Sequence, residues 1–212
     1  MPKYFITIAG NIGVGKSTLT DLLSQKLGWK PVYEAVEENP YLTDFYLDMN
    51  RWAFQSQAFF LSRRLRQHHQ LLKIPDDVIQ DRSVYEDAEV FARNLYQRGY
   101  MSRRDWNTYC ELYEILSQLL KPPHFVVYLR ASVPTLIRRI SQRGRAYERQ
   151  ISPDYLEQLN ELYDEWAAGF RLCPVLTVET DNLDYVQHDE HLDQITLRLL
   201  DRLHGREYLE LG

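Results

Sequence analysis

The sequence predicts an α/β fold in which a five-stranded parallel sheet has helices on both faces. Five short apolar segments alternate with helical patterns along the chain, which is typical of parallel sheets built from βα units. The 212 residues are about 1.4 times a domain length of about 150 residues, and no linker or internal repeat interrupts them. We therefore expect a single domain that spans residues 1–212.

The five expected strands share three properties: they are short, rich in apolar β-forming residues, and bounded by glycine, proline or polar residues. In chain order they are expected at residues 3–9, 32–33, 78–80, 125–129 and 175–178. The residues to inspect at their carboxyl ends are Gly10, Glu34, Asp81, Arg130 and Glu179. Because ligands of such folds bind beyond the carboxyl ends of the strands, these positions are the first candidates for a site.

The helices are expected between these strands. In chain order they cover about residues 16–27, 51–72, 83–97, 102–120, 132–143 and 153–170, with a last helix that ends near residue 203. Ser83 and Ser132 can cap their helices, and Pro134 is compatible with a first turn. Pro75 and Pro122 interrupt the pattern after two of the helices. Residues 144–151 remain as an arginine-rich loop.

Composition excludes several classes of protein. Apolar residues make up 44% and charged residues 26%, which excludes a disordered or collagen-like chain. The net charge of −5 argues against nucleic acid as a partner. No apolar run approaches the ~18 residues that span a bilayer, so no membrane partner is expected. Two cysteines, Cys110 and Cys173, are too few for a disulfide framework, so we expect reduced thiols and a cytoplasmic protein without a signal peptide.

A phosphate-binding motif joins the first strand to the first helix. Residues 10–17, GNIGVGKS, fit G-x-x-x-x-G-K-[ST] at every fixed position. Glycines allow backbone N–H groups to surround an anion at a helix N-terminus, Lys16 can reach the β- and γ-phosphates, and Ser17 can hold Mg²⁺. The motif predicts a nucleoside triphosphate site. Its candidate residues are Gly10, Asn11, Gly13, Gly15, Lys16, Ser17 and Thr18.

Two acids follow other strands. Asp81 comes directly after the third strand and can hold Mg²⁺ or accept a proton from a substrate hydroxyl. Glu34 follows the second strand and is another candidate for the general base. Arg82 can contact the transferred phosphoryl group. Spacing along the sequence does not decide which acid is the base and which serves the metal.

Arginines are concentrated in one segment. Five of them fall between residues 138 and 149, namely Arg138, Arg139, Arg143, Arg145 and Arg149. Arg139 and Arg143 are four residues apart and therefore share one helix face. Arginines that close over a triphosphate would exclude water and stabilise charge on the transferring phosphoryl group. The segment at about 143–151 is thus a candidate lid, and Glu148 is the one acid within it.

With these motifs in order, the sequence resembles the deoxyribonucleoside kinase family from Ile6 to about Leu203. The resemblance rests on residues 10–17, 34–36 (EAV), 51–57 (RWAFQSQ), 81–87 (DRSVYED) and on RGR at 143–145 with Glu148. The stretch EAVEENPY at 34–41 is most similar to bacterial deoxyadenosine and deoxyguanosine kinases, although the family carries a proline at Ala35. The resemblance implies a P-loop kinase fold and transfer of a phosphoryl group from ATP, with Mg²⁺, to the 5′-hydroxyl of a 2′-deoxyribonucleoside.

The resemblance also implies roles for residues at the reacting groups. Glu34 would be the base that faces the 5′-hydroxyl, and Arg82 would contact the 5′-oxygen and the phosphoryl group. Asp81 would serve Mg²⁺, where many relatives carry glutamate. The donor would be bound by the lid arginines Arg139 and Arg143 at its phosphates and by the segment that begins with Asp181 at its adenine.

The deoxynucleoside would contact six further side chains: Tyr46 and Glu148 at the 3′-hydroxyl, Gln57 and Phe91 at the base, and Arg64 with Asp87 as a charged pair beside it. Gln55 lies two residues before Gln57, so on a helix only one of them can face a pocket. Counting from Arg51 favours Gln57. His68 and His69, near the end of the same helix, are expected to be solvated.

The charged pair bears on which base is accepted. Its bulk and polarity would meet the methyl group of thymine, while Gln57 offers a donor and an acceptor that match adenine or cytosine. We expect deoxyadenosine first, with deoxyguanosine or deoxycytidine as alternatives. The resemblance further implies a homodimer, because the expected helices at 51–72 and 102–120 are long and rich in aromatic residues.

Two other functions compete with this interpretation. A nucleoside monophosphate kinase would need cations for the phosphate of its acceptor, but the acceptor side offers Glu34, Tyr46 and Gln57, which suit an uncharged sugar and base. A nucleotide-binding switch would carry an Asn-Lys-x-Asp motif to read guanine. Neither Lys73 nor Lys121 lies in such a motif.

Overall fold

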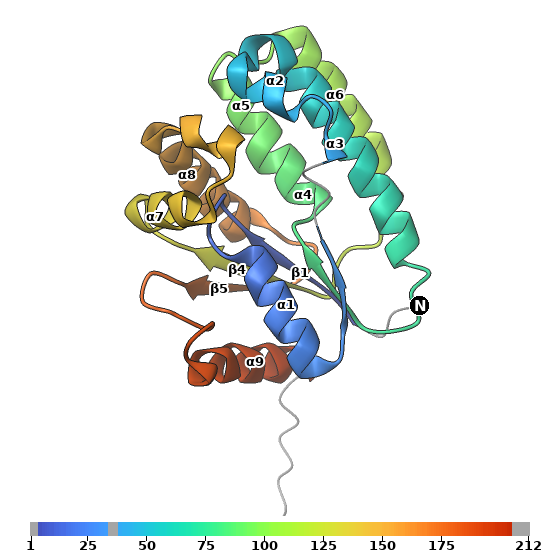
Figure 1. Cartoon of the computed structure of the whole chain (residues 1–212). Helices are drawn as coiled ribbons and strands as arrows, with labels where there is room; N and C mark the ends of the chain where they lie inside the picture. Colours follow the sequence, from blue (N-terminus) through green and yellow to red (C-terminus); the bar gives the residue numbers. More distant parts are fainter. Residues whose placement is uncertain (1–3, 34–37, 205–212) are drawn as a thin grey trace, which may run out of the picture.

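A sheet of five parallel strands forms the centre of the computed structural model, which describes residues 4–33 and 38–204. The strand order is β2-β3-β1-β4-β5 (Figure 1). Their bounds are β1 (Phe5–Gly10), β2 (Lys30–Val32), β3 (Val78–Asp81), β4 (Phe125–Arg130) and β5 (Val175–Glu179), and every neighbouring pair is parallel. The prediction of an α/β fold with a five-stranded parallel sheet is confirmed.

Helices cover both faces of this sheet (Figure 1). Side chains of β4 alternate between the faces, so that Tyr128 joins one apolar cluster and Val127 the other. Helices α1, α7 and α9 contribute to the cluster of Val127, and α3, α5, α6 and α8 contribute to that of Tyr128. The helices are α1 (Lys16–Leu27), α2 (Leu42–Leu47), α3 (Met49–Leu71), α4 (Val84–Glu86), η2 (Asp87–Ala92), α5 (Arg93–Gln97), α6 (Arg103–Ser117), α7 (Val133–Arg143), η3 (Ala146–Gln150), α8 (Pro153–Gly169) and α9 (Asp189–His204).

The order of the predicted elements is confirmed, with three corrections. Strand β2 lies at Lys30–Val32 rather than at residues 32–33. Helix α2 is not indicated by the sequence, because six residues are too few to show a helical period. The helix expected over 83–97 contains a π-helical stretch, η2, in which the Arg93 N–H donates to the carbonyl of Ala88 five residues earlier. The spacing of apolar residues does not distinguish such a stretch from an α-helix.

Glycine is required where the central strand ends. Gly10 has φ 141°, and a Cβ atom there would lie only 2.4 Å from the carbonyl oxygen of Leu129 on β4. Gly15, with φ 104°, occupies the position before α1, and a Cβ atom there would lie 2.3 Å from the Tyr185 hydroxyl. Two fixed glycines of the phosphate-binding motif therefore also allow close packing of β1 and α1 against their neighbours.

The expectations about membrane-spanning segments and about the cysteines can be compared with the structure. Among the helices within residues 4–33 and 38–204, none has both the length and the apolar content to cross a membrane. Cys110 and Cys173 are both free thiols and are half-buried.

His68 lies inside the fold, which corrects the expectation that it is solvated. Its ring packs edge-on against Phe5, with 5.6 Å between centroids, and its Nε2 accepts a hydrogen bond from the Lys121 N–H at 3.2 Å. His69, the next residue of α3, is exposed as expected. Burial lowers the pKa of His68 below its usual value of 6.5, because the charged ring would lose its hydration.

We predict that His68 makes the stability of the fold depend on pH. A histidine with a lowered pKa in the folded state contributes stability that is complete above pH 6.5 and declines as pH falls from there through the lower folded pKa. The variant His68→Gln keeps an acceptor for Lys121 but does not titrate, so its urea midpoint should fall less between pH 7.5 and 5.5 than that of the unmodified protein. The matched control His69→Gln should keep the full decline, and equal slopes for all three proteins would contradict the prediction.

Candidate active site

The phosphate-binding loop forms between the carboxyl end of β1 and α1. The Nζ of Lys16 donates to the carbonyl oxygens of Gly10 and Asn11, both at 2.9 Å, so the loop curls around its own lysine. The Tyr185 hydroxyl donates to the carbonyl of Gly15 at 3.2 Å. Lys16 is 8% exposed and is therefore positioned within the loop rather than free in solvent.

Asn11 connects the phosphate-binding loop to α8. Its Nδ2 donates to the carbonyl of Leu156 at 2.9 Å and to the side chain of Asn160 at 2.8 Å, and its Oδ1 accepts from the Ile12 N–H at 2.7 Å. The side chain is 1% exposed and points to α8. Asn11 was expected to bind the nucleotide, and the structure places its side chain away from the cavity that the loop lines.

Two cavities meet at this loop. One has a volume of about 780 Å³ and is bordered by the loop, α7 and the segment 181–187; the other has about 330 Å³ and lies between the loop, α2, α3 and η3. The residues that border both are Gly13, Lys16, Ser17, Arg143 and Arg145. The sequence-predicted residues divide between the cavities: Gly13, Gly15, Lys16, Ser17, Thr18, Arg139, Arg143 and Asp181 line the larger, and Tyr46, Gln57, Asp81, Arg82, Phe91 and Glu148 line the smaller.

The larger cavity has a wall of arginines. Arg139 is held by three hydrogen bonds: its Nη1 donates to the carbonyl of Val14 at 3.0 Å and to the Thr180 hydroxyl at 3.1 Å, and its Nη2 donates to the carbonyl of Thr180 at 2.7 Å. Arg138, Arg143 and Arg145 lie along the same wall. A wall of this kind suits a polyanion such as a triphosphate.

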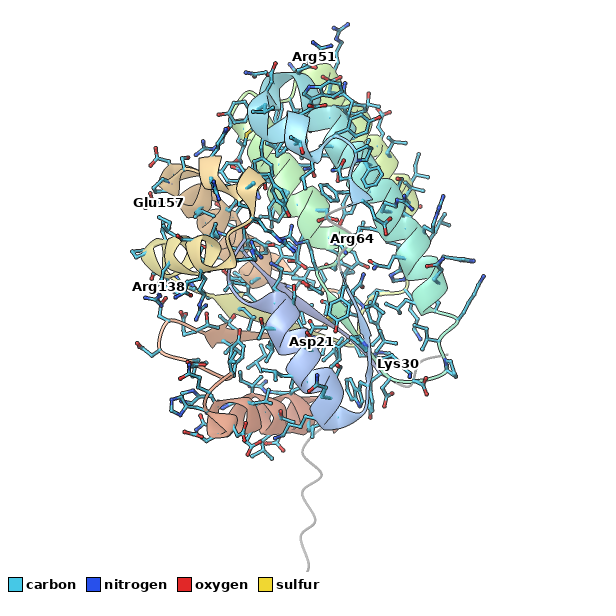
Figure 2. All side chains as sticks on the ribbon, in the orientation of Figure 1. Asp21, Lys30, Arg51, Arg64, Arg138 and Glu157 are labelled. Carbon is cyan, nitrogen blue, oxygen red and sulfur yellow. The ribbon has the colours of Figure 1, made fainter. Side chains whose placement is uncertain are left out.

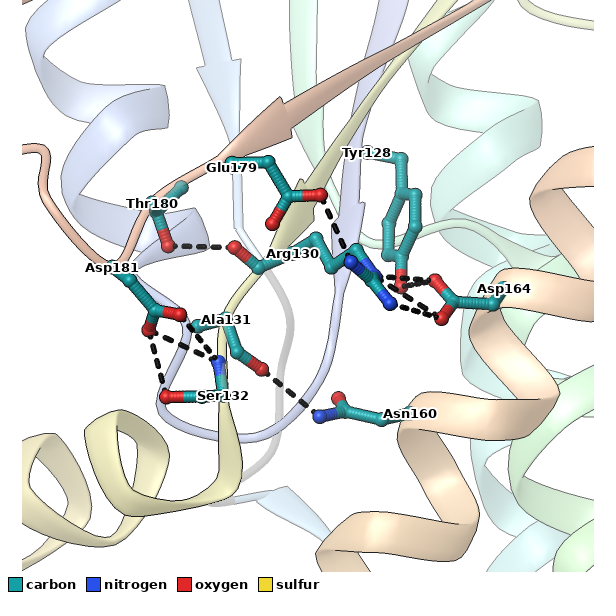
Figure 3. A network of polar contacts seen from close by, with 9 residues as sticks. All are labelled: Tyr128, Arg130, Ala131, Ser132, Asn160, Asp164, Glu179, Thr180 and Asp181. Carbon is teal, nitrogen blue, oxygen red and sulfur yellow. Dashed lines mark hydrogen bonds and ion pairs between the residues drawn. The ribbon is translucent and has the colours of Figure 1, made fainter.

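Asp181 stabilises the turn that leads into α7. Its carboxylate accepts from the N–H of Ser132 at 3.0 Å and from the Ser132 hydroxyl at 2.9 Å (Figure 3). Desolvation would raise the pKa of Asp181, but hydrogen bonds from Thr135 and Ser132 outweigh it and lower the pKa below the usual range. Asp181 thus keeps its charge and joins the ends of β4 and β5 beside the larger cavity.

A second group of polar contacts holds the same edge of the sheet. The guanidinium of Arg130 pairs with Asp164 at 2.9 Å and with Glu179 at 3.0 Å, and the Asn160 side chain donates to the carbonyl of Ala131 (Figure 3). Because Asn160 also accepts from Asn11, it connects the end of β4 to the phosphate-binding loop.

Arg82 enters the smaller cavity from a strained backbone. It has φ 64°, the only positive value among the non-glycine residues of the described ranges, and its N–H donates to the carbonyl of Ile8 at 3.0 Å. Its guanidinium lies over the ring of Phe91, 4.1 Å from the centroid. Phe91 belongs to η2, so the π-helical stretch carries the ring that faces Arg82.

Asp81 and Ser17 lie together between the cavities. The Ser17 hydroxyl donates to Asp81 Oδ2 at 2.5 Å, while Asp81 Oδ1 is buried and has no hydrogen-bond partner among the described residues. A buried carboxylate oxygen without a donor beside a serine hydroxyl fits a magnesium ligand. Within residues 4–33 and 38–204, no three His, Cys, Asp or Glu side chains form a metal cage.

Of Gln55 and Gln57 on α3, Gln57 is the one that faces the smaller cavity. It is 4% exposed and its Oε1 has no hydrogen-bond partner among the described residues, whereas Gln55 is exposed. Behind it, Arg64 Nε pairs with Asp87 Oδ2 at 2.8 Å, and both side chains are almost fully buried. Figure 2 shows Arg64 in the interior and Arg51 at the outer end of the molecule. The charged pair therefore lies in the wall behind Gln57 and not among the residues that line the cavity.

The opposite wall is built from the lid and α2. Tyr46 stacks on Tyr147 with 5.7 Å between ring centroids, and Glu148 is 4% exposed and pairs with Arg143 at 2.6 Å. Burial, followed by neighbouring Tyr155 and Glu148, raises the pKa of Tyr46 far above its usual value. Tyr46 is therefore a hydrogen-bond donor beside a carboxylate acceptor, an arrangement that suits a hydroxyl group.

Some functional candidates differ between sequence and structure. Glu34 lies outside the described residues. Several side chains near the site were not predicted, among them Tyr147, Tyr155 and Glu86. In the sequence, the two tyrosines do not differ from other aromatic residues. The spacing of Glu86 from Ser83 predicts a capping box, and the structure shows that capping box.

Comparison with known proteins identifies the family. The family model for deoxynucleoside kinases matches residues 6–203. The chain belongs to the deoxynucleoside kinase family. It is therefore a phosphotransferase, and the competing interpretations as a monophosphate kinase or a nucleotide switch are wrong. The family implies an ATP-type phosphate donor.

Individual relatives of this deoxynucleoside kinase include two enzymes of Bacillus subtilis. The deoxyadenosine/deoxycytidine kinase is 36% identical over 95% of this chain and 94% of that protein, and the deoxyguanosine kinase is 37% identical over 90% and 93%. A solved structure of deoxyadenosine kinase from M. mycoides with bound dATP aligns with a TM-score of 0.83 and 33% identity, covering 93% of this chain and 99% of that one. The fold predicted from the sequence is that of the family.

Proposed function

We propose that this kinase transfers the γ-phosphoryl group of ATP to the 5′-hydroxyl of a 2′-deoxyribonucleoside. The observation that carries the proposal is the meeting of two different cavities at Lys16 and Ser17. The larger has an arginine wall that suits a triphosphate, and the smaller has aromatic rings and uncharged polar groups that suit a sugar and a base. Transfer between them requires only that both ligands reach the loop at once.

In this proposal the larger cavity binds the donor. Backbone N–H groups of residues 13–18 and the Nζ of Lys16 surround the β- and γ-phosphates. Arg139 and Arg143 stabilise the negative charge that moves during transfer. The segment from Asp181 onward lies at the far end of the same cavity and would contact the adenine.

The smaller cavity binds the acceptor. Phe91 stacks on the base, and Gln57 pairs with its edge through an Oε1 that no described residue contacts by a hydrogen bond. Tyr46 and Glu148 bind the 3′-hydroxyl as donor and acceptor. Arg82, held over Phe91, contacts the 5′-oxygen and the transferred phosphoryl group.

Asp81 and Ser17 are the residues that would hold Mg²⁺. When bound, the ion would neutralise charge on the donor phosphates. The Asp81 oxygen without a donor supports this assignment over a second role as general base.

Glu34 is the proposed general base. The preceding residue, Tyr33, borders the smaller cavity, and its carbonyl accepts from the Gln67 side chain at 2.6 Å. Residue 34 thus follows a residue that is held at the edge of the acceptor cavity. A carboxylate at this point can accept the proton of the 5′-hydroxyl as the phosphoryl group arrives.

Replacing Glu34 by Gln should lower turnover about 10²- to 10⁴-fold, because this is the usual contribution of a general base. The dissociation constant for ATP, measured by calorimetry, should change little because Glu34 serves the acceptor. Asp81→Asn is the comparison, since it should also impair use of Mg²⁺. Near-normal turnover of Glu34→Gln would instead assign the base to Asp81.

We further propose deoxyadenosine as the preferred acceptor, with deoxyguanosine and deoxycytidine as alternatives. The Arg64–Asp87 ion pair joins α3, which carries Gln57, to η2, which carries Phe91, and so supports the two side chains that would contact the base. Gln57 can donate to N1 or accept from the N6 amino group of adenine. The similar curated relatives phosphorylate deoxyadenosine, deoxycytidine or deoxyguanosine according to their names, which supports this range.

We predict that kcat/KM is highest for deoxyadenosine and lowest for thymidine when all four deoxynucleosides are compared. Gln57→Leu should lower kcat/KM for the best substrate about 5- to 150-fold, because one or two polar groups of the base lose their partner at ~1–3 kcal/mol. The matched control Gln55→Leu, on the exposed face of the same helix, should have almost no effect. Thymidine as the best substrate would contradict the proposed pairing of Gln57 with the base.

We also propose a homodimer formed through α6. Leu112 and Ile115 on α6 and Leu119 in the turn after it are 40%, 63% and 76% exposed, which leaves apolar side chains in water. A second copy of the chain would cover them. Light scattering should give twice the chain mass of 25.3 kDa at micromolar concentration, and Ile115→Glu should shift the protein toward the single-chain mass. A single-chain mass for the unmodified protein would contradict the dimer.

A further inference from the structure

Glu86 is a fully buried carboxylate that borders neither cavity. Its Oε2 accepts from the N–H of Gly10 at 3.2 Å and from the hydroxyl of Tyr163 at 2.9 Å. Its Oε1 accepts from the N–H of Ser83 at 2.9 Å and from the Ser83 hydroxyl at 3.3 Å. Four hydrogen bonds therefore converge on one side chain beneath the active site.

The geometry favours a carboxylate at Glu86, because two backbone N–H groups can only donate to it and both hydroxyls can donate as well. Burial raises the pKa of Glu86, while the nearby cations Arg82 and Lys16 oppose that rise. Glu86 thus lies close to both of the cations that the proposed reaction uses.

The two backbone donors come from the two segments that carry those cations. Gly10, with φ 141°, begins the loop of Lys16, and Ser83 follows Arg82, whose φ is 64°. The positive φ of Arg82 persists only where surrounding contacts hold it, whereas Gly10 adopts its φ because it has no Cβ. Among the side chains in residues 4–33 and 38–204, Glu86 is the one that accepts from both segments, and Tyr163 on α8 adds a neutral donor to it.

We propose that Glu86 is a positioning residue for phosphoryl transfer, which sets the loop of Lys16 and the turn of Arg82 at the correct separation. This inference rests on the proposed function. Because Glu86 touches neither ligand cavity, its loss should affect the reaction of bound substrates more than their binding. A shift of about 1 Å between reacting groups can cost about 10²-fold in rate.

The test replaces Glu86 by Gln, which keeps the shape but turns an amide N–H₂ toward groups that also donate. We expect kcat with ATP and the best deoxynucleoside to fall about 10- to 100-fold, with both KM values within about threefold of the unmodified enzyme. The matched control is Glu89→Gln, three residues further along the same helical segment, where the carboxylate accepts from Tyr113 at 2.7 Å on the outer surface. It should leave kcat and both KM values unchanged.

Tyr163→Phe separates positioning from stability. It removes one neutral donor to Glu86 but leaves both backbone contacts, so Tm should fall while kcat stays within about threefold. If Glu86→Gln does not fold, Glu86→Asp decides the question, because its shorter carboxylate cannot reach both backbone donors and should also lower kcat at unchanged KM.

Three results would overturn the proposal: a kcat of the folded Glu86 variant within about threefold of the unmodified enzyme, a rise in KM without a loss of kcat, or an equal loss of kcat in Glu89→Gln. The proposed function is judged separately, by turnover of the unmodified enzyme with ATP and deoxynucleosides. The positioning role is judged by the ratio of variant to unmodified kcat, so the two failures are distinguishable.

Discussion

Repulsion among cations is the constraint that the active site has to satisfy. Lys16, Arg82, Arg139, Arg143 and Arg145 lie around two adjoining cavities. With no ligand present they would repel one another, so the fold keeps carboxylates within the same walls. Glu148 pairs with Arg143, and Glu86 lies near Lys16 and Arg82. A bound polyanion would neutralise the positive charges of these side chains that the carboxylates do not.

This constraint also explains how the two cavities are coupled. Arg143 borders both of them and is held by Glu148, which faces the proposed sugar site. A ligand hydroxyl that engages Glu148 therefore competes for the same carboxylate as the arginine. In the proposed function, occupation of the smaller cavity would therefore alter the ion pair of Arg143, which also borders the larger cavity.

Much of this arrangement can be predicted from the sequence, because local patterns determine it. The bounds of α1 follow from the motif and from the glycines on either side, and Gln57 rather than Gln55 follows from helical phase. What could not be predicted depends on contacts between distant segments. His68 reads as solvated beside polar neighbours, yet Phe5 and Lys121 enclose it. Glu86 reads as a capping acid, and only the approach of Gly10 and Tyr163 gives it further partners.

The π-helical stretch η2 constrains insertions and deletions in this segment, because it carries two side chains with separate partners. Its hydrogen bonds reach five residues back, so it accommodates more residues per turn than the α-helical segments on either side. Asp87, which pairs with Arg64, lies at its start, and Phe91, which lies under Arg82, comes four residues later. Substitution of the exposed Glu89 leaves this spacing intact. Insertion or loss of one residue would rotate one of these side chains about the helix axis relative to the other. The number of residues in η2 is therefore more constrained than their identity.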